Sequence, residues 1–143
     1  MNIDFSVRLP TDAHSVPLVR GLLRQALEHL AVPQPVIDEI LLALTEACAN
    51  VVDHVHDQEA YQVDVSITDE LCRISVLDDG EGFDPEGVQV LDQPTDAERG
   101  RGLVLMRALV DRLQFVQDAD GRHRVTFEKR LAAQQPHLRL LQS

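Results

Sequence analysis

The sequence predicts an α/β fold, a two-layer sandwich with helices on one face of a mixed, largely antiparallel sheet. A length of 143 residues with 44% hydrophobic content suits one domain with its own core. The helical stretches each carry one apolar face, which must be buried against another layer. Two pairs of alternating segments are separated by short turns, the pattern of antiparallel hairpins. We therefore expect one domain over residues 1–130 and a separate tail over 131–143.

The first two predicted elements are a strand and a helix. Residues 3–9 alternate between apolar and polar side chains up to Pro10, which predicts a short, half-buried strand at a sheet edge. A helix with a core-facing apolar side is expected over residues 16–30. Thr11 or Asp12 is expected to cap its start, because short polar side chains satisfy free N–H groups there.

The second predicted helix, which begins at Pro35 and ends before Asp57, has two different faces. Its core face follows the i, i+3, i+4 pattern and consists of Ile37, Ile40, Leu41, Leu44, Cys48, Val51, Val52 and Val55. Glu46, Asn50 and His54 recur at four-residue spacing and form one polar stripe, which we expect to face away from the core. Two small residues lie beside this stripe and are expected to leave a shallow surface: Ala43 and Ala47.

An antiparallel hairpin is predicted over residues 61–77, with its turn at residues 69–70. The second strand of the hairpin ends at Asp78, and Gly80 and Gly82 follow, where the backbone needs conformational freedom. An acid at a strand end can accept a hydrogen bond from an amino group. We interpret this stretch as the floor of a nucleotide pocket.

The segment 84–99 is rich in acids and has no sustained periodicity. Its length suits a mobile loop over a ligand, although a plain surface loop would have the same composition. Gly100 and Gly102 are expected to open a helix over residues 102–113, where free N–H groups can bind an anion. The last predicted hairpin turns at Gly121, which can take a positive φ.

Charge and composition limit the class of partner. A net charge of −11 with 13 Lys and Arg argues against nucleic acid or an anionic membrane as the main partner. The N-terminus has no basic region followed by an apolar one, and no apolar run approaches the ~18 residues of a membrane span. We therefore expect a cytoplasmic protein. Cys48 and Cys72 lack metal-ligand spacing and are expected to be buried thiols.

Three of these stretches, in this order, resemble the ATP-binding motifs of the GHKL superfamily, the histidine-kinase-like ATPases with the Bergerat fold. Within that superfamily the chain is most similar to the small anti-sigma-factor serine/threonine protein kinases. The matching stretches are the N box (Glu46, Asn50 and His54), the first glycine box (Asp78, Gly80 and Gly82) and the second glycine box (Gly100, Arg101, Gly102 and Leu103).

The resemblance implies ATP and Mg²⁺ as cofactors and suggests a role for each box. Asp78 would accept a hydrogen bond from the adenine amine, which selects ATP over GTP. Asn50 would offer an amide oxygen to Mg²⁺, and residues 100–103 would meet the phosphates. Glu46 would orient or deprotonate an incoming hydroxyl. His54 would serve to fix the helix against the loop that covers the ligand.

The resemblance also implies a function and its partners. It implies a serine protein kinase that acts as an anti-sigma factor, binds a sigma factor and phosphorylates a serine of a STAS-domain antagonist in a partner-switching pathway. A homodimer is left open, because such kinases often form dimers.

Two alternatives to the kinase remain. One is a catalytically silent, ATP-gated binding module of the same fold. The other is a detached histidine-kinase catalytic domain or ATPase fragment, which is disfavoured because no dimerisation and phosphoacceptor helix pair precedes the domain. Glu46 favours the kinase over the binding module, although an acid there also suits hydrolysis.

Overall fold

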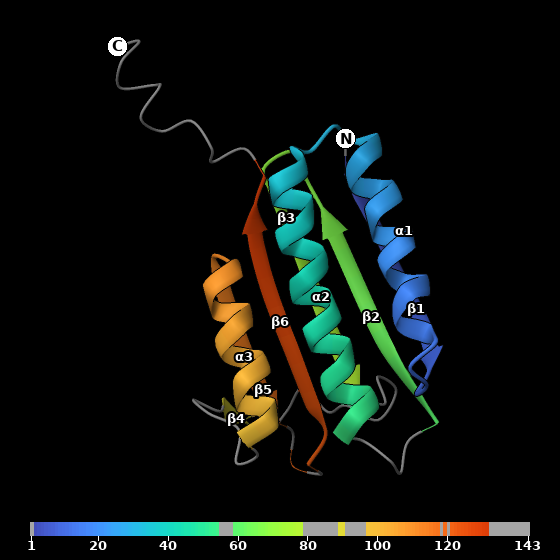
Figure 1. Ribbon diagram of the computed structural model, residues 1–143, viewed down its shortest axis with the longest axis vertical. Helices are drawn as coiled ribbons and strands as arrows, with labels where there is room; N and C mark the ends of the chain where they lie inside the picture. The colour runs from blue at the N-terminus through green and yellow to red at the C-terminus, as the bar shows by residue number, and fades with distance from the viewer. Residues whose placement is uncertain are drawn as a thin grey trace.

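The computed structural model describes residues 2–54, 59–78, 89–90, 97–117, 119 and 121–131, with the backbone alone for residues 54, 89–90 and 97–101. Its elements are β1 (Ile3–Pro10), α1 (Ser15–His29), α2 (Gln34–His54), β2 (Ala60–Ile67), β3 (Leu71–Asp78), β4 (Gln89–Val90), α3 (Ala97–Leu109), β5 (Arg112–Gln117) and β6 (His123–Arg130). Figure 1 shows the three helices side by side on one face of the sheet. The predicted two-layer α/β sandwich is confirmed.

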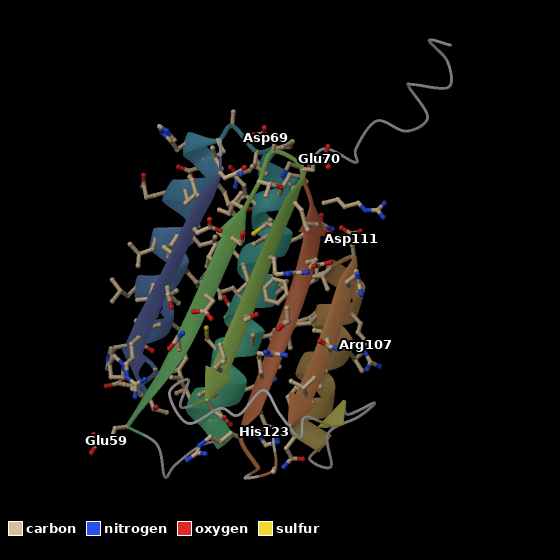
Figure 2. The ribbon with its side chains drawn as sticks, turned by 180° about the vertical axis from the view of Figure 1, so that it is seen from behind. Glu59, Asp69, Glu70, Arg107, Asp111 and His123 are labelled. Carbon is tan, nitrogen blue, oxygen red and sulfur yellow. The ribbon has the colours of Figure 1, made fainter. Side chains whose placement is uncertain are left out.

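The described strands form one sheet in the order β1-β2-β3-β6-β5-β4, and every pairing among them is antiparallel. β1 lies at one edge, as predicted. Leu77 near the end of β3 pairs with Arg124 near the start of β6. Asp78 and His123 therefore meet at the same end of the sheet. Figure 2 shows His123 at the end opposite the turn of Asp69 and Glu70.

The core lies between the helices and the inner face of the sheet. Alternate residues of β2 point into it and are almost completely buried: Tyr61, Val63, Val65 and Ile67. The hydroxyl of Tyr61 lies 2.7 Å from Ser15 Oγ, so this buried polar group is hydrogen-bonded. Cys48 and Cys72 are buried as predicted, and burial raises the pKa of each thiol to about 12. Both thiols are therefore protonated at neutral pH.

The other face of the sheet carries polar side chains, and no helix among the described elements covers it (Figure 2). Glu128 of β6 is 8% exposed, and its carboxylate accepts a hydrogen bond from Arg73 Nε at 2.7 Å. Ser75 and Thr126 pair across the same two strands at 2.9 Å. These cross-strand contacts stabilise the β3–β6 pairing without a second layer.

Lys129 ties two helices to the sheet at the end remote from His123. Its ammonium donates a hydrogen bond to the carbonyl oxygen of Leu109 at 2.7 Å, at the C-terminus of α3. It also lies 3.3 Å from a carboxylate oxygen of Glu39 on α2. A cation at this position satisfies a free carbonyl group and is favoured by the helix dipole.

The predicted start of the first helix is wrong in detail. α1 begins at Ser15 with His14 at the N-cap position, and no side chain caps it. Asp12 instead accepts a hydrogen bond from the backbone N–H of His14 at 2.9 Å, in a turn that precedes the helix. This contact and the neighbouring His14 ring lower the pKa of the Asp12 carboxyl group.

The third helix also differs from the prediction. α3 begins at Ala97 and ends at Leu109, so Gly100 and Gly102 are its fourth and sixth residues and do not open it. Within the segment predicted as a loop, the structure describes the first residues of α3 and the two-residue strand β4, which pairs with β5. The mobile-loop interpretation otherwise falls on residues outside the described ranges.

The C-terminal end of the described chain is Leu131, which is 5% exposed and packs in the core. The predicted tail otherwise lies outside the described residues. Among the described helices, none combines the length and apolar character that a membrane span requires.

Two glycines allow a comparison of alanine substitution at a positive φ and within a helix. Gly121 has φ +85°, so Gly121→Ala is expected to lower the free energy of unfolding by about 1–2 kcal/mol. Gly21 lies within α1, and a Cβ there would meet no atom within 4 Å. Gly21→Ala is expected to raise the same quantity by about 1 kcal/mol. Urea unfolding of both variants measures the difference, and a change of the same sign in both would contradict this account.

Candidate functional site

The carboxylate of Asp78 lies at the end of β3 and is held by the start of β6. The residue is 5% exposed. Its Oδ1 accepts a hydrogen bond from the backbone N–H of His123 at 2.7 Å, and its Oδ2 lies 3.2 Å from Nδ1 of the same residue. The imidazole stacks on Phe115 of β5, with ring centroids 5.2 Å apart and planes 12° from parallel. One residue thus contacts both carboxylate oxygens.

A small cavity lies between α2 and this end of the sheet. Three of its residues are polar and the others are apolar or aromatic: Ala47, Asn50, Val51, Val76, Asp78, Phe115, His123 and Val125. Its volume of about 20 Å³ is enough for about one water molecule. Pockets that hold small molecules have roughly 300 Å³ or more. The described residues alone therefore enclose less space than a nucleotide base fills.

Glu46 and Asn50 are half-buried residues of α2 that face α3. A Cβ atom added to Gly102 would lie 3.2 Å from Asn50 Oδ1 and 3.3 Å from Glu46 Oε2, so both oxygens surround one point on α3. The prediction that the polar stripe faces open surface is therefore wrong for these two residues. Ala43 and Ala47 are 0% and 1% exposed, so the shallow surface predicted beside the stripe is also absent there.

The side-chain amide of Asn50 is incompletely paired. Its Nδ2 atom is buried and makes no hydrogen bond among the described residues. Buried polar atoms without a partner are uncommon, and they often mark the site of a water or ligand. Because Asn50 also lines the cavity, this atom supports a polar ligand at the boundary between α2, α3 and the strand end.

The oxygens of Glu46 and Asn50 suit a hard cation, but not a site made of protein ligands alone. Among the described residues, no group of three or more His, Cys, Asp or Glu side chains could hold a metal ion. Mg²⁺ commonly takes only one or two protein ligands and completes its shell with water and phosphate oxygens. The donor set therefore fits Mg²⁺ that arrives with a nucleotide.

The structure brings together four of the predicted site residues: Glu46, Asn50, Asp78 and Gly102. Leu103 is 3% exposed and packs in the core beneath α3. Gly100, Arg101 and His54 are described by their backbone alone, within α3 and α2. Gly80 and Gly82 lie outside the described residues.

His123 and Phe115 were not predicted as site residues. His123 shares its inward direction with Val125 and Phe127, which a strand alternation over residues 123–127 could have indicated. Its proximity to Asp78 depends on the pairing of β3 with β6, strands separated by more than forty residues. No local pattern signals that pairing.

The fold and this site define a class of protein, a two-layer α/β domain with a small, partly polar cavity between one helix and the end of a central strand. The family model of the histidine kinase-like ATPase domain matches residues 9–129. The chain belongs to this family, and the resemblance drawn from its three motifs is confirmed.

Comparison with individual proteins gives a consistent result. The chain is 28% identical over 120 residues to the serine-protein kinase RsbW of Halalkalibacterium halodurans, covering 78% of this chain and 74% of that protein. It is 24% identical over 122 residues to the RsbW serine-protein kinase of Bacillus cereus strain Q1, covering 78% and 76%.

A solved structure shares the fold. The crystal structure of the RsbU and RsbW domains of a Mycobacterium tuberculosis protein superposes with a TM-score of 0.68 at 22% identity. The match covers 90% of this chain and 32% of that one, so the chain spans about a third of the solved protein.

The contact between α3 and α2 predicts the effect of Gly102→Ala. An added methyl group would press on the Asn50 and Glu46 side chains, so the affinity for Mg²⁺ and ATP is expected to fall about tenfold. The gain in helix propensity, about 1 kcal/mol, should offset most of the crowding in the free energy of unfolding. Calorimetric titration and urea unfolding measure the two effects. Unchanged affinity would show that α3 does not need this close approach.

Proposed function

We propose that this chain is an ATP-dependent serine protein kinase that acts as an anti-sigma factor and phosphorylates a serine of a STAS-domain antagonist. The observation that carries the proposal is that three polar side chains lie close together. Asp78 and Asn50 line the same cavity, and Asn50 and Glu46 both lie against Gly102 of α3. Membership of the ATPase family supports it, as do relatives named serine-protein kinases.

Asp78 is proposed to recognise the base. Its Oδ1 is held by a backbone N–H, which orients the carboxylate and leaves Oδ2 directed at side-chain partners. Adenine carries an amine that donates to such an oxygen, whereas guanine carries a carbonyl at that position. Gly80 and Gly82 are proposed to let the backbone approach the same base.

Asn50 is proposed to hold Mg²⁺ through its amide oxygen. The backbone of Gly100, Arg101, Gly102 and Leu103 is proposed to lie along the phosphates, with the Arg101 guanidinium as a further donor. ATP supplies the phosphoryl group, and Mg²⁺ neutralises charge on the phosphates. The close approach of Gly102 to Asn50 supports a metal site at this helix contact.

Glu46 is proposed to act on the hydroxyl of the substrate serine. It lies one helical turn before Asn50, a rise of about 6 Å along α2. A carboxylate beside the terminal phosphate can accept the proton of an attacking hydroxyl or orient it. His54, one turn beyond Asn50, is proposed to hold the end of α2 beside the nucleotide.

The charge of the chain supports protein partners. With a net charge of −11, it would repel the nucleic-acid backbone and anionic lipid. A STAS-domain antagonist, a sigma factor and a second copy of the chain are the proposed partners, met in the cytoplasm. An ATP-gated binding module without kinase activity is the second candidate, because the residues that line the cavity could bind ATP whether or not phosphate is transferred.

Asp78→Asn tests the base assignment. The substitution keeps the shape of the side chain but removes its charge and replaces one acceptor with a donor, so ATP affinity is expected to fall about 10- to 100-fold. GTP affinity should change little, and the preference for ATP should narrow. Titration of both nucleotides in the presence of Mg²⁺ measures this. Equal ATP and GTP affinities in the unsubstituted chain, unaffected by the change, would remove the assignment.

Glu46→Gln separates the kinase from the binding module. ATP binding should persist while phosphate transfer to a STAS-domain protein falls about 10²-fold or more, because positioned acid–base groups contribute that much. Asn50→Asp serves as the contrast, since it changes the charge of the metal ligand and should alter Mg²⁺ and ATP binding together.

Phosphorylation assays with labelled ATP give the rates for this comparison. A Glu46→Gln protein that transfers phosphate at the original rate contradicts the base role. If the unsubstituted chain binds ATP and a partner but never transfers phosphate, the binding module is the correct function.

A further inference from the structure

The oxygen of Asp78 that a base amine would need is in contact with a side chain of the same protein. His123 Nδ1 lies 3.2 Å from Asp78 Oδ2, and the two side chains are 23% and 7% exposed. The pair therefore lies mostly out of solvent, at the wall of the cavity that both residues line. A base amine that binds Oδ2 must therefore share this oxygen with the imidazole or displace it.

The two contacts between these residues differ in what they depend on. The bond to Oδ1 comes from the backbone N–H of His123, so it persists with any side chain at that position except proline. The contact with Oδ2 comes from the ring, which is oriented by its stacking on Phe115. The ring can therefore turn away while Asp78 stays anchored to β6.

The available space gives a second, independent reason for movement. The part of the cavity that the described residues enclose, about 20 Å³, is smaller than a purine. Of the residues around it, Val76, Phe115 and Val125 are buried side chains of paired strands, and Ala47 is small. His123 combines partial exposure with a position at the first residue of β6, so it can leave with the least disruption of the core.

We infer that His123 is a gate on the base site: its imidazole contacts the oxygen of Asp78 that a base would use and must turn away before an adenine base binds. The inference rests on the proposed ATP-binding function. A site that is open for only a fraction of the time has its apparent affinity reduced by that fraction. The gate therefore lowers the affinity for ATP in proportion to the population of the closed state.

His123→Ala and His123→Phe test the gate. The alanine variant removes the ring but keeps the backbone bond to Asp78, so its affinity for ATP is expected to rise about tenfold. The phenylalanine variant keeps a ring able to stack on Phe115 but has no ring nitrogen to contact Oδ2, and its affinity should fall between the other two. His14→Ala removes a similar contact, between His14 Nδ1 and Asp12 Oδ1 at 2.9 Å, made by residues that do not line the cavity, and should leave affinity unchanged.

Inorganic triphosphate with Mg²⁺ is the control ligand, because it has no base. Its affinity should be equal in the unsubstituted chain and in His123→Ala. A second measurement needs no substitution: in NMR spectra of the unsubstituted chain, ATP should shift the ring signals of both His123 and Phe115 as their stacking ends, whereas triphosphate should not.

The outcomes separate the gate from the function on which it rests. If the unsubstituted chain binds ATP and His123→Ala binds it equally or more weakly, the gate is wrong and the imidazole instead contributes to base binding or has no role. Ring signals that do not move on ATP binding also overturn the gate. If neither the unsubstituted chain nor His123→Ala binds ATP, the proposed function fails together with the gate.

Discussion

The structure depends on one helix that is packed on two sides. α2 buries its apolar face against the sheet, with Ile40 and Leu44 completely excluded from solvent. On another side its polar residues Glu46 and Asn50 meet α3 at a glycine. The first contact stabilises the fold through apolar burial. The second leaves the buried Asn50 Nδ2 atom without a hydrogen bond among the described residues.

The two ends of the sheet are closed by different kinds of contact. At the Asp69 and Glu70 end, turns and backbone hydrogen bonds close the structure, including the bond from the N–H of Leu131 to the carbonyl of Glu70. At the other end a backbone hydrogen bond joins the N–H of Thr11 to the carbonyl of Glu59, and the Asp78 carboxylate and the His123 imidazole add a side-chain contact.

Much of this arrangement could be predicted from the sequence, because it follows from local periodicity. The alternation in β2 and the spacing along α2 are properties of short segments, and both give the correct buried face. Asp78 at a strand end was equally local. The limits of α3 could not be predicted from a short segment. Gly100 and Gly102 weaken the helical pattern, whereas packing against α2 stabilises the helix. His123 entered the site through strand pairing, which no segment encodes alone.

The contact made by Lys129 holds the C-terminal end of α3. Its ammonium binds the carbonyl of Leu109 at the end of the helix and also lies near Glu39 of α2. Gly102, seven residues before Leu109 in α3, lies against the polar residues of α2. A helix held at its C-terminus can change its contact with α2 near its N-terminus by rotating about the held end. A rotation of a few degrees about Leu109 would translate into a much larger displacement at the first turn than at the last.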